Sequence, residues 1–150
     1  MRIDWGSGTE ISIDGAPAAS VQRGFWGEKA TIQLGDVIWE FGTEGMKVLV
    51  AYGHGQQSMH ARSVSSWRMH WQIETSPGQV LDLRPAGVFT QAFNLEYGGQ
   101  VVARIEPKAW SSRPSMEVPD GLTVPQAIFV MWVCYVLTKR SAATIVATSS

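Results

Sequence analysis

The segment Ala127–Leu137, with the sequence AIFVMWVCYVL, decides the fold of this chain. Every side chain in it is apolar or aromatic, so a helix formed here has no polar face and has to be buried in protein or in membrane. A bilayer span takes about 20 mostly apolar residues, whereas a run of about 10–14 is more typical of a buried core helix. Pro125-Gln126 precedes the run and Thr138-Lys139-Arg140 ends it. The sequence therefore predicts a helix inside a protein core.

Residues on both sides of this segment are typical of helix ends. Thr123 is a good N-cap, and Pro125 falls in the first turn, where its missing N–H costs little. Lys139 and Arg140 suit the negative pole of the helix dipole. We expect a single domain over residues 1–140 with its helix near 123–140, and a flexible tail over 141–150, which is rich in Ser, Thr and Ala.

The rest of the chain has the period-two alternation of β-strands. In Trp67–Glu74, the apolar residues Trp67, Met69, Trp71 and Ile73 alternate with polar ones, which would scatter around a helix but share one face of a strand. Glycine-rich turns separate the strands and predict hairpins. The predicted strands are Glu10–Asp14, Ser20–Trp26, Lys29–Leu34, Val37–Phe41, Met46–Tyr52, Trp67–Glu74, Val80–Arg84, Val88–Glu96, Gln100–Glu106 and Ser115–Val118.

Ten to twelve short strands followed by one hydrophobic helix predict an all-β fold. A closed barrel leaves no exposed strand edge, and about a dozen strands enclose more space than their own side chains fill. A helix about 10–12 Å across could fill that space. We therefore predict a closed β-barrel of about twelve strands around a buried C-terminal helix. Most of the seven tryptophans are expected to face its core.

Composition limits the function. The 150 residues are 45% hydrophobic and 17% charged with a net charge of −1, which indicates a globular domain without bulk attraction to nucleic acid. The single cysteine, Cys134, excludes an intrachain disulfide framework and is expected to be an inert buried thiol. The N-terminal sequence lacks the layout of a signal peptide, so we expect a cytoplasmic protein.

No catalytic or metal site is predicted. The spacing of His54, His60 and His70 matches no usual zinc-ligand pattern. The serines near them lack a nucleophile-elbow sequence, and the carboxylates fall mostly at polar strand positions. We therefore expect a protein that is not an enzyme and that needs no cofactor.

One ligand site is predicted, for an anionic headgroup. Trp110 lies in a loop between Lys108 and Arg113, and an aromatic residue beside cations suits a membrane interface or an anionic lipid. Lys139 and Arg140 at the predicted helix end complete this set. The expected location thus includes a peripheral contact with the membrane.

The order of strands, paired hairpins such as Val88–Glu96 with Gln100–Glu106, and the segment Ala127–Leu137 resemble the tubby C-terminal-like superfamily. This superfamily includes phospholipid scramblases and the plant LURP-one-related proteins, and the resemblance implies a twelve-stranded barrel closed around a hydrophobic helix. It also implies a module that contacts anionic phospholipid, as tubby domains do, or a protein partner. The calcium-binding segment and the cysteine cluster of scramblases have no counterpart here, so calcium-driven lipid scrambling is not implied.

Two alternatives remain open at this point. The first is a ligand-carrying barrel similar in outline to lipocalins, with a cavity beside the helix. The second is a membrane protein anchored by residues 122–137. The sequence leaves the oligomeric state undetermined.

Overall fold

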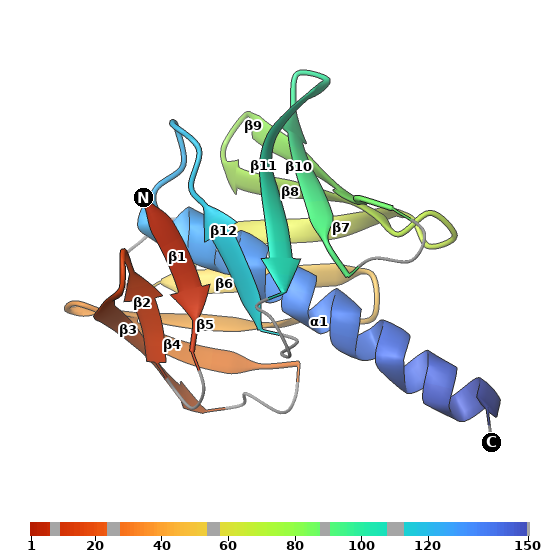
Figure 1. The fold of residues 1–150 in the computed structure, drawn as a ribbon, viewed down its shortest axis with the longest axis horizontal. Helices are drawn as coiled ribbons and strands as arrows, with labels where there is room; N and C mark the ends of the chain where they lie inside the picture. The colour runs from red at the N-terminus through yellow and green to blue at the C-terminus, as the bar shows by residue number, and fades with distance from the viewer. Residues whose placement is uncertain (7–9, 24–27, 54–57, 88–90, 108–112, 150) are drawn as a thin grey trace.

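In the computed structural model, the chain forms a closed barrel of twelve antiparallel strands and one helix (Figure 1). The structure describes residues 1–6, 10–23, 28–53, 58–87, 91–107 and 113–149. The strands are β1 (Arg2–Trp5), β2 (Glu10–Ile13), β3 (Ala16–Arg23), β4 (Ala30–Leu34), β5 (Val37–Thr43), β6 (Val48–Gly53), β7 (Met59–Ser65), β8 (His70–Ser76), β9 (Gln79–Pro85), β10 (Phe93–Tyr97), β11 (Gln100–Pro107) and β12 (Pro114–Glu117), and the helix is α1 (Val124–Ser149).

The strands follow one another around the barrel in chain order, and β1 closes the circle. Ile3 of β1 lies opposite Ile13 of β2 on one side and opposite Met116 of β12 on the other. Each strand therefore has a neighbour on both sides, which removes the long open edges of a flat sheet. The predicted fold class is confirmed.

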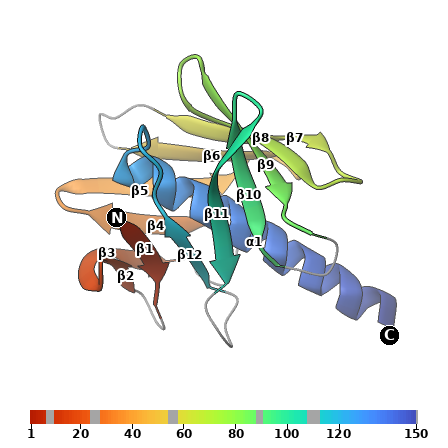
Figure 2. The ribbon, with the colours of Figure 1, turned by 45° about the horizontal axis from the view of Figure 1, so that its top comes forward.

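The first half of α1 runs through the barrel and the second half leaves it, as Figures 1 and 2 show. Residues Ala127–Leu137 are at most 4% exposed on every side of the helix. Phe129 and Trp132 pack against Phe41 of β5, each with ring centroids 5.3 Å from the Phe41 ring. Burying one large apolar side chain is worth about 1.5–3 kcal/mol, so this helix and the inner barrel wall stabilise each other.

A capping box fixes the start of α1. The Thr123 N–H donates to Oε1 of Gln126 over 2.9 Å, and the Gln126 N–H donates to Oγ1 of Thr123 over 3.4 Å. Nε2 of Gln126 also donates to the carbonyl of Thr75 in β8, which ties the helix to the barrel. The N-cap role predicted for Thr123 is confirmed.

The helix is longer than predicted, because it continues through residues 141–149. Forming the first turn is the step of helix formation that costs free energy, and the buried half of α1 has already made that step. Residues such as Ala142 and Ala143 then extend the helix easily. Lys139 and Arg140 therefore lie well before the last turn, and their expected role at the negative pole of the dipole is wrong.

Two strands, β1 and β7, were not predicted, and several predicted strands begin later than expected, among them β6 at Val48, β8 at His70 and β10 at Phe93. In β7 the residues that face inward include Ala61 and Ser63, so its apolar alternation is weak. β8 begins at His70, whereas Trp67 lies in the turn before it and is 94% exposed. The expected core position holds for Trp5, Trp39, Trp71 and Trp132 but is wrong for Trp67. Trp26 and Trp110, of which the second was expected in a loop, lie outside the described residues.

Replacing a tryptophan at each of these two kinds of site tests the arrangement. Trp132→Ala should lower the free energy of unfolding by about 3–5 kcal/mol, because it leaves a large cavity between helix and wall. Trp67→Ala is the matched control and should stay within about 0.5 kcal/mol of the parent protein. Urea unfolding followed by far-UV circular dichroism measures both values. Equal losses would contradict the buried-helix arrangement.

The thiol of Cys134 gives a second test. Complete burial in the apolar core raises its pKa far above the ordinary value, so almost no thiolate forms at neutral pH. Iodoacetamide at pH 8 should therefore leave the native protein unmodified and alkylate it quickly in 6 M guanidinium chloride, as mass spectrometry would report. Rapid alkylation without denaturant would show that the helix leaves the barrel readily.

Candidate functional site

The two ends of the barrel are built from different connections. At the helix-start end lie the turns at Asp14–Gly15, Gly35–Asp36, Pro77–Gly78 and Gly98–Gly99, and residues 118–123 before α1. At the helix-exit end lie residues 28–29, the turns at 44–47 and 66–69, residues 86–87 and 91–92, and Arg113. Consecutive strands run in opposite directions, so alternate connections fall at the same end.

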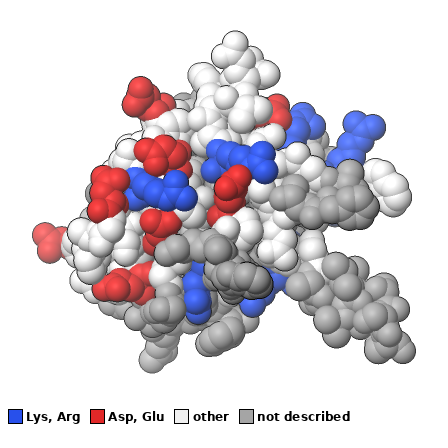
Figure 3. Space-filling view, in the orientation of Figure 1, with Lys and Arg blue, Asp and Glu red and all other residues white. Residues whose placement is uncertain are grey.

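The charges of these two ends differ in sign. The described turns of the helix-start end contain Asp14, Asp36 and Asp120 and no Lys or Arg. In the described connections of the helix-exit end, the acids Glu28 and Glu44 stand against the cations Lys29, Lys47, Arg68 and Arg113, and α1 adds Lys139 and Arg140. On the face drawn in Figure 3, the acidic side chains gather on the left, where α1 begins, and basic ones continue to the right. The protein therefore presents a cationic end although its net charge is −1.

Trp67 is the most exposed large apolar residue of the described chain and belongs to this cationic end. It lies in the turn between β7 and β8, next to the exposed Arg68. Oγ of Ser65 accepts from the Arg68 N–H, and Met69 has a φ of +50°, a left-handed conformation that side chains rarely adopt. These features turn the chain before His70 and direct Trp67 away from the core.

The neighbouring turn lies close to this tryptophan turn. The Ser63 N–H of β7 donates to the carbonyl of Lys47 over 2.9 Å, which places residues 44–47 beside the end of β7. Met46 is 69% exposed and Lys47 is exposed as well. The two turns together present two apolar side chains and two cations.

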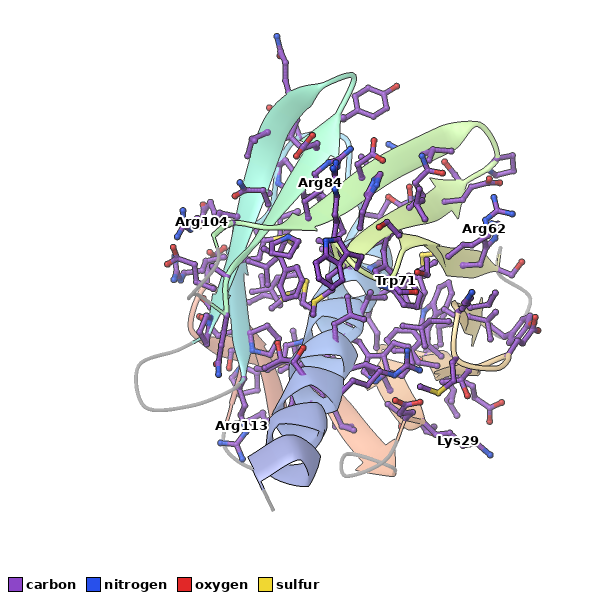
Figure 4. The ribbon with its side chains drawn as sticks, turned by 90° about the vertical axis from the view of Figure 1, so that its right-hand side faces the viewer. Lys29, Arg62, Trp71, Arg84, Arg104 and Arg113 are labelled. Atoms are coloured by element: carbon purple, nitrogen blue, oxygen red, sulfur yellow. The ribbon has the colours of Figure 1, made fainter. Side chains whose placement is uncertain are left out.

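The structure brings three of the five predicted site residues to this end. Lys139 is exposed, with Nζ 5.5 Å from the centroid of the Tyr135 ring. Figure 4, which looks at the helix-exit end, shows Arg113 on one side of α1 and Lys29 on the other. Lys108 and Trp110 lie outside the described residues.

Arg140 holds the helix in place. Its guanidinium binds the carboxylate of Glu28 through two hydrogen bonds, from Nε to Oε1 and from Nη2 to Oε2 over 2.8 Å, and Nη1 donates to the carbonyl of Met46. The Arg140 side chain is only 17% exposed. Arg140 already serves three acceptors, so its role here is to fix the helix in the barrel.

Sequence reasoning missed Lys29, Lys47, Trp67 and Arg68 as members of this site. Lys29 and Lys47 were read as the edges of strands, and Trp67 and Arg68 as the start of one. Counting connections around the barrel assigns all of these residues to one end only when β7 is included, because each strand reverses the direction of the chain. The serines at 65 and 66, which favour turns, were the local signal.

The described residues offer no other obvious reactive centre. His70 lies 2.7 Å from Oδ1 of Asp82, and His60 lies 3.9 Å from Glu74, while His54 is outside the described residues. Among the described residues no three His, Cys, Asp or Glu side chains could share a metal ion. Within that same part of the chain, α1 lacks the combination of length and apolar character needed to cross a bilayer.

The ion pair between Arg140 and Glu28 predicts a pH-dependent stability. The hydrogen bonds and charge of Arg140 lower the pKa of Glu28 below its ordinary value of 4.5. The pair therefore stabilises the fold above about pH 4.5, and this contribution disappears as the pH falls through the lowered pKa. Arg140→Ala should cost about 1 kcal/mol at pH 7 and progressively less as the pH falls below 4.5 towards pH 3.

Urea unfolding at both pH values measures this difference. Lys139→Ala is the matched control, because it removes the adjacent cation without touching Glu28, and it should show little change at either pH. A cost of Arg140→Ala that is equal at pH 7 and pH 3 would assign the effect to packing instead of charge.

Comparison with known proteins finds no matching protein-family model, no matching curated protein and no matching solved structure. The resemblance to tubby-like proteins therefore stays a prediction, whereas the helix-filled barrel is observed. The function has to be argued from the surface that this chain presents.

Proposed function

We propose that this protein is a non-enzymatic binding module that docks its helix-exit end on an anionic phospholipid surface. One observation carries the proposal: Trp67, 94% exposed, stands beside Arg68 at an end of the barrel where cations outnumber acids. Tryptophan prefers the boundary between lipid and water, because its ring is apolar and its N–H is polar. The cations around it supply attraction to negative headgroups.

The strength of such a contact comes from several small contributions. Each Lys or Arg near an anionic surface is worth about 1 kcal/mol, which is roughly a fivefold change in binding. Lys29, Lys47, Arg68 and Lys139 are exposed at this end. Trp67 and Met46 would add apolar burial at the headgroup boundary. The resulting contact is peripheral and sensitive to salt.

The filled interior favours an outer-surface role over the two alternatives. Residues Ala127–Leu137, which a lipocalin-like carrier would need to leave beside a cavity, form one packed cluster with the inward residues of the strands. The same residues would face lipid in an anchored protein, yet here the barrel wall covers them. A protein partner at the helix-exit end is the second candidate, favoured by exposed Trp67, since tryptophan is common at interface hot spots.

Flotation with liposomes tests the proposal. The full chain should float with vesicles of phosphatidylcholine and phosphatidylserine at low salt, and should not float with phosphatidylcholine alone. Trp67→Ala and Arg68→Gln should each weaken binding, the second by roughly fivefold. Raising the salt to about 0.5 M should release the protein, because exposed charges are then screened.

Two control variants change equivalent residues elsewhere. Tyr97→Ala removes a 53% exposed aromatic residue at the helix-start end, and Arg104→Gln removes an exposed cation from the barrel wall. Neither should alter flotation by more than about a fifth of the Arg68→Gln effect. No flotation with anionic vesicles, or equal effects of control and site variants, would rule out this surface as a lipid contact.

A further inference from the structure

A row of apolar side chains lies on the outer face of β6, where water-exposed polar residues are usual. Leu49 and Ala51 face inward and are fully buried, so the alternating residues Val48, Val50 and Tyr52 face outward. Tyr52 is 52% exposed. The outer wall therefore has an apolar strip at this strand that the core does not use.

The ring of Tyr52 extends along this strip. The Glu44 N–H donates to the carbonyl of Val48 over 2.8 Å, which places Glu44 at the Val48 end of the row. Tyr52 lies at the other end, roughly 13 Å away along an extended strand. Its hydroxyl nevertheless donates to Oε1 of Glu44 over 3.0 Å. The two side chains therefore extend toward each other along the wall, and their hydrogen bond fixes the orientation of the ring.

A hollow of about 260 Å³ opens beside this ring. We call it the β6 hollow, and its lining is Glu44, Val48, Val50, Tyr52, Ser58, Met59 and His60. Gly42 of β5 lies directly opposite Val50, and a Cβ added there would meet nothing within 4 Å. The missing side chain at Gly42 therefore leaves room beside Val50.

The Val48 end of the hollow has charges of both signs. Arg62 of β7 lies opposite Val48, and Figure 4 shows it on the outside of the barrel. Lys47 belongs to the same turn as Glu44, and both residues are exposed. The acid at this end is therefore accompanied by two cations.

The rest of the hollow offers further hydrogen-bonding groups. Nε2 of His60 lies 3.9 Å from Oε2 of Glu74, and Ser58 contributes a hydroxyl. Glu40 lies opposite Tyr52. Together with the Val48 end, the described surroundings of the hollow contain three acids and two cations, so neither sign of charge dominates. This balance favours a neutral ligand.

From this combination we infer that the β6 hollow binds a neutral sugar. A pyranose ring has an apolar C–H face and a rim of hydroxyl groups that both donate and accept hydrogen bonds. The C–H face lies on Val50 and the Tyr52 ring, and the hydroxyls bond to Glu44 and His60. An apolar floor with a few polar groups that fix the orientation of the ligand is usual for small-molecule sites. These four side chains are not part of the proposed lipid contact, so the inference does not depend on it.

Three neutral trisaccharides test the inference on the ¹⁵N-labelled full chain by NMR: cellotriose, maltotriose and chitotriose. At least one of them should shift the amide signals of Val48, Val50 and Tyr52 in a saturable way. Sorbitol at the same concentration is the matched control. It should cause no saturable shift, because it has hydroxyl groups but no ring that could lie on Tyr52.

Two variants test the roles of the side chains. Tyr52→Ala should weaken the binding of that sugar by about two- to tenfold, because it removes the aromatic surface. Glu44→Gln should weaken it by roughly twofold, since a neutral amide is a weaker acceptor than a carboxylate. Tyr97→Ala removes a 53% exposed aromatic residue at the helix-start end and should leave sugar binding unchanged. Tyr52→Ala should float with anionic vesicles as the parent protein does, so the sugar site and the lipid contact are tested separately.

Four results would each overturn the inference. They are no saturable shift with any of the three sugars up to about 20 mM, an equal response to sorbitol, shifts confined to the turn that contains Trp67, and equal effects of Tyr52→Ala and Tyr97→Ala. The amide spectrum of each variant without sugar checks its fold. If Tyr52→Ala misfolds, the comparison of Glu44→Gln with Tyr97→Ala decides the outcome.

Discussion

The whole structure depends on a helix segment that has no polar face. Such a segment is stable in water only when apolar side chains surround it completely, and an open sheet cannot do this. A closed barrel of twelve strands provides the surrounding wall and would itself be hollow without the helix. The packing of Phe129 and Trp132 on Phe41 is the local form of this mutual dependence. Neither part is expected to be stable without the other.

Because α1 fills the barrel, a ligand or partner is expected to bind on its outer surface. Because strands alternate in direction, each connection is assigned to one end or the other, and the sequence can give the two ends different chemistry. In this chain the acidic turns fall where the helix starts, and the cations gather where it leaves. The ion pair between Arg140 and Glu28 holds the helix at the cationic end. The Arg140 side chain thus connects the helix to the surface of the helix-exit end.

The sequence predicted the elements that have a strong periodic pattern of apolar residues. It missed the elements whose pattern is weak or misleading. The segment Ala127–Leu137 and the hairpins were sufficient to predict the barrel and its buried helix. β7 was missed because small residues such as Ala61 face the crowded interior, where a large side chain is not needed. Trp67 was misplaced because it lies in phase with Trp71, and period alone cannot show where a strand stops. A site made of turns was difficult to predict, since turns far apart in sequence meet only once the barrel closes.

The exposure of Trp67 can be expressed as a free energy. Leaving a large apolar side chain in water forgoes about 1.5–3 kcal/mol that burial would provide. The left-handed conformation of Met69, which turns the chain and directs Trp67 outward, adds roughly 1–2 kcal/mol. A polar residue at position 67 would avoid the first cost, whereas a glycine at position 69 would avoid the second only by removing a side chain that packs against the core. The exposed Trp67 supports the proposed contact at the helix-exit end, because covering this side chain with another surface would provide the burial that the isolated fold does not.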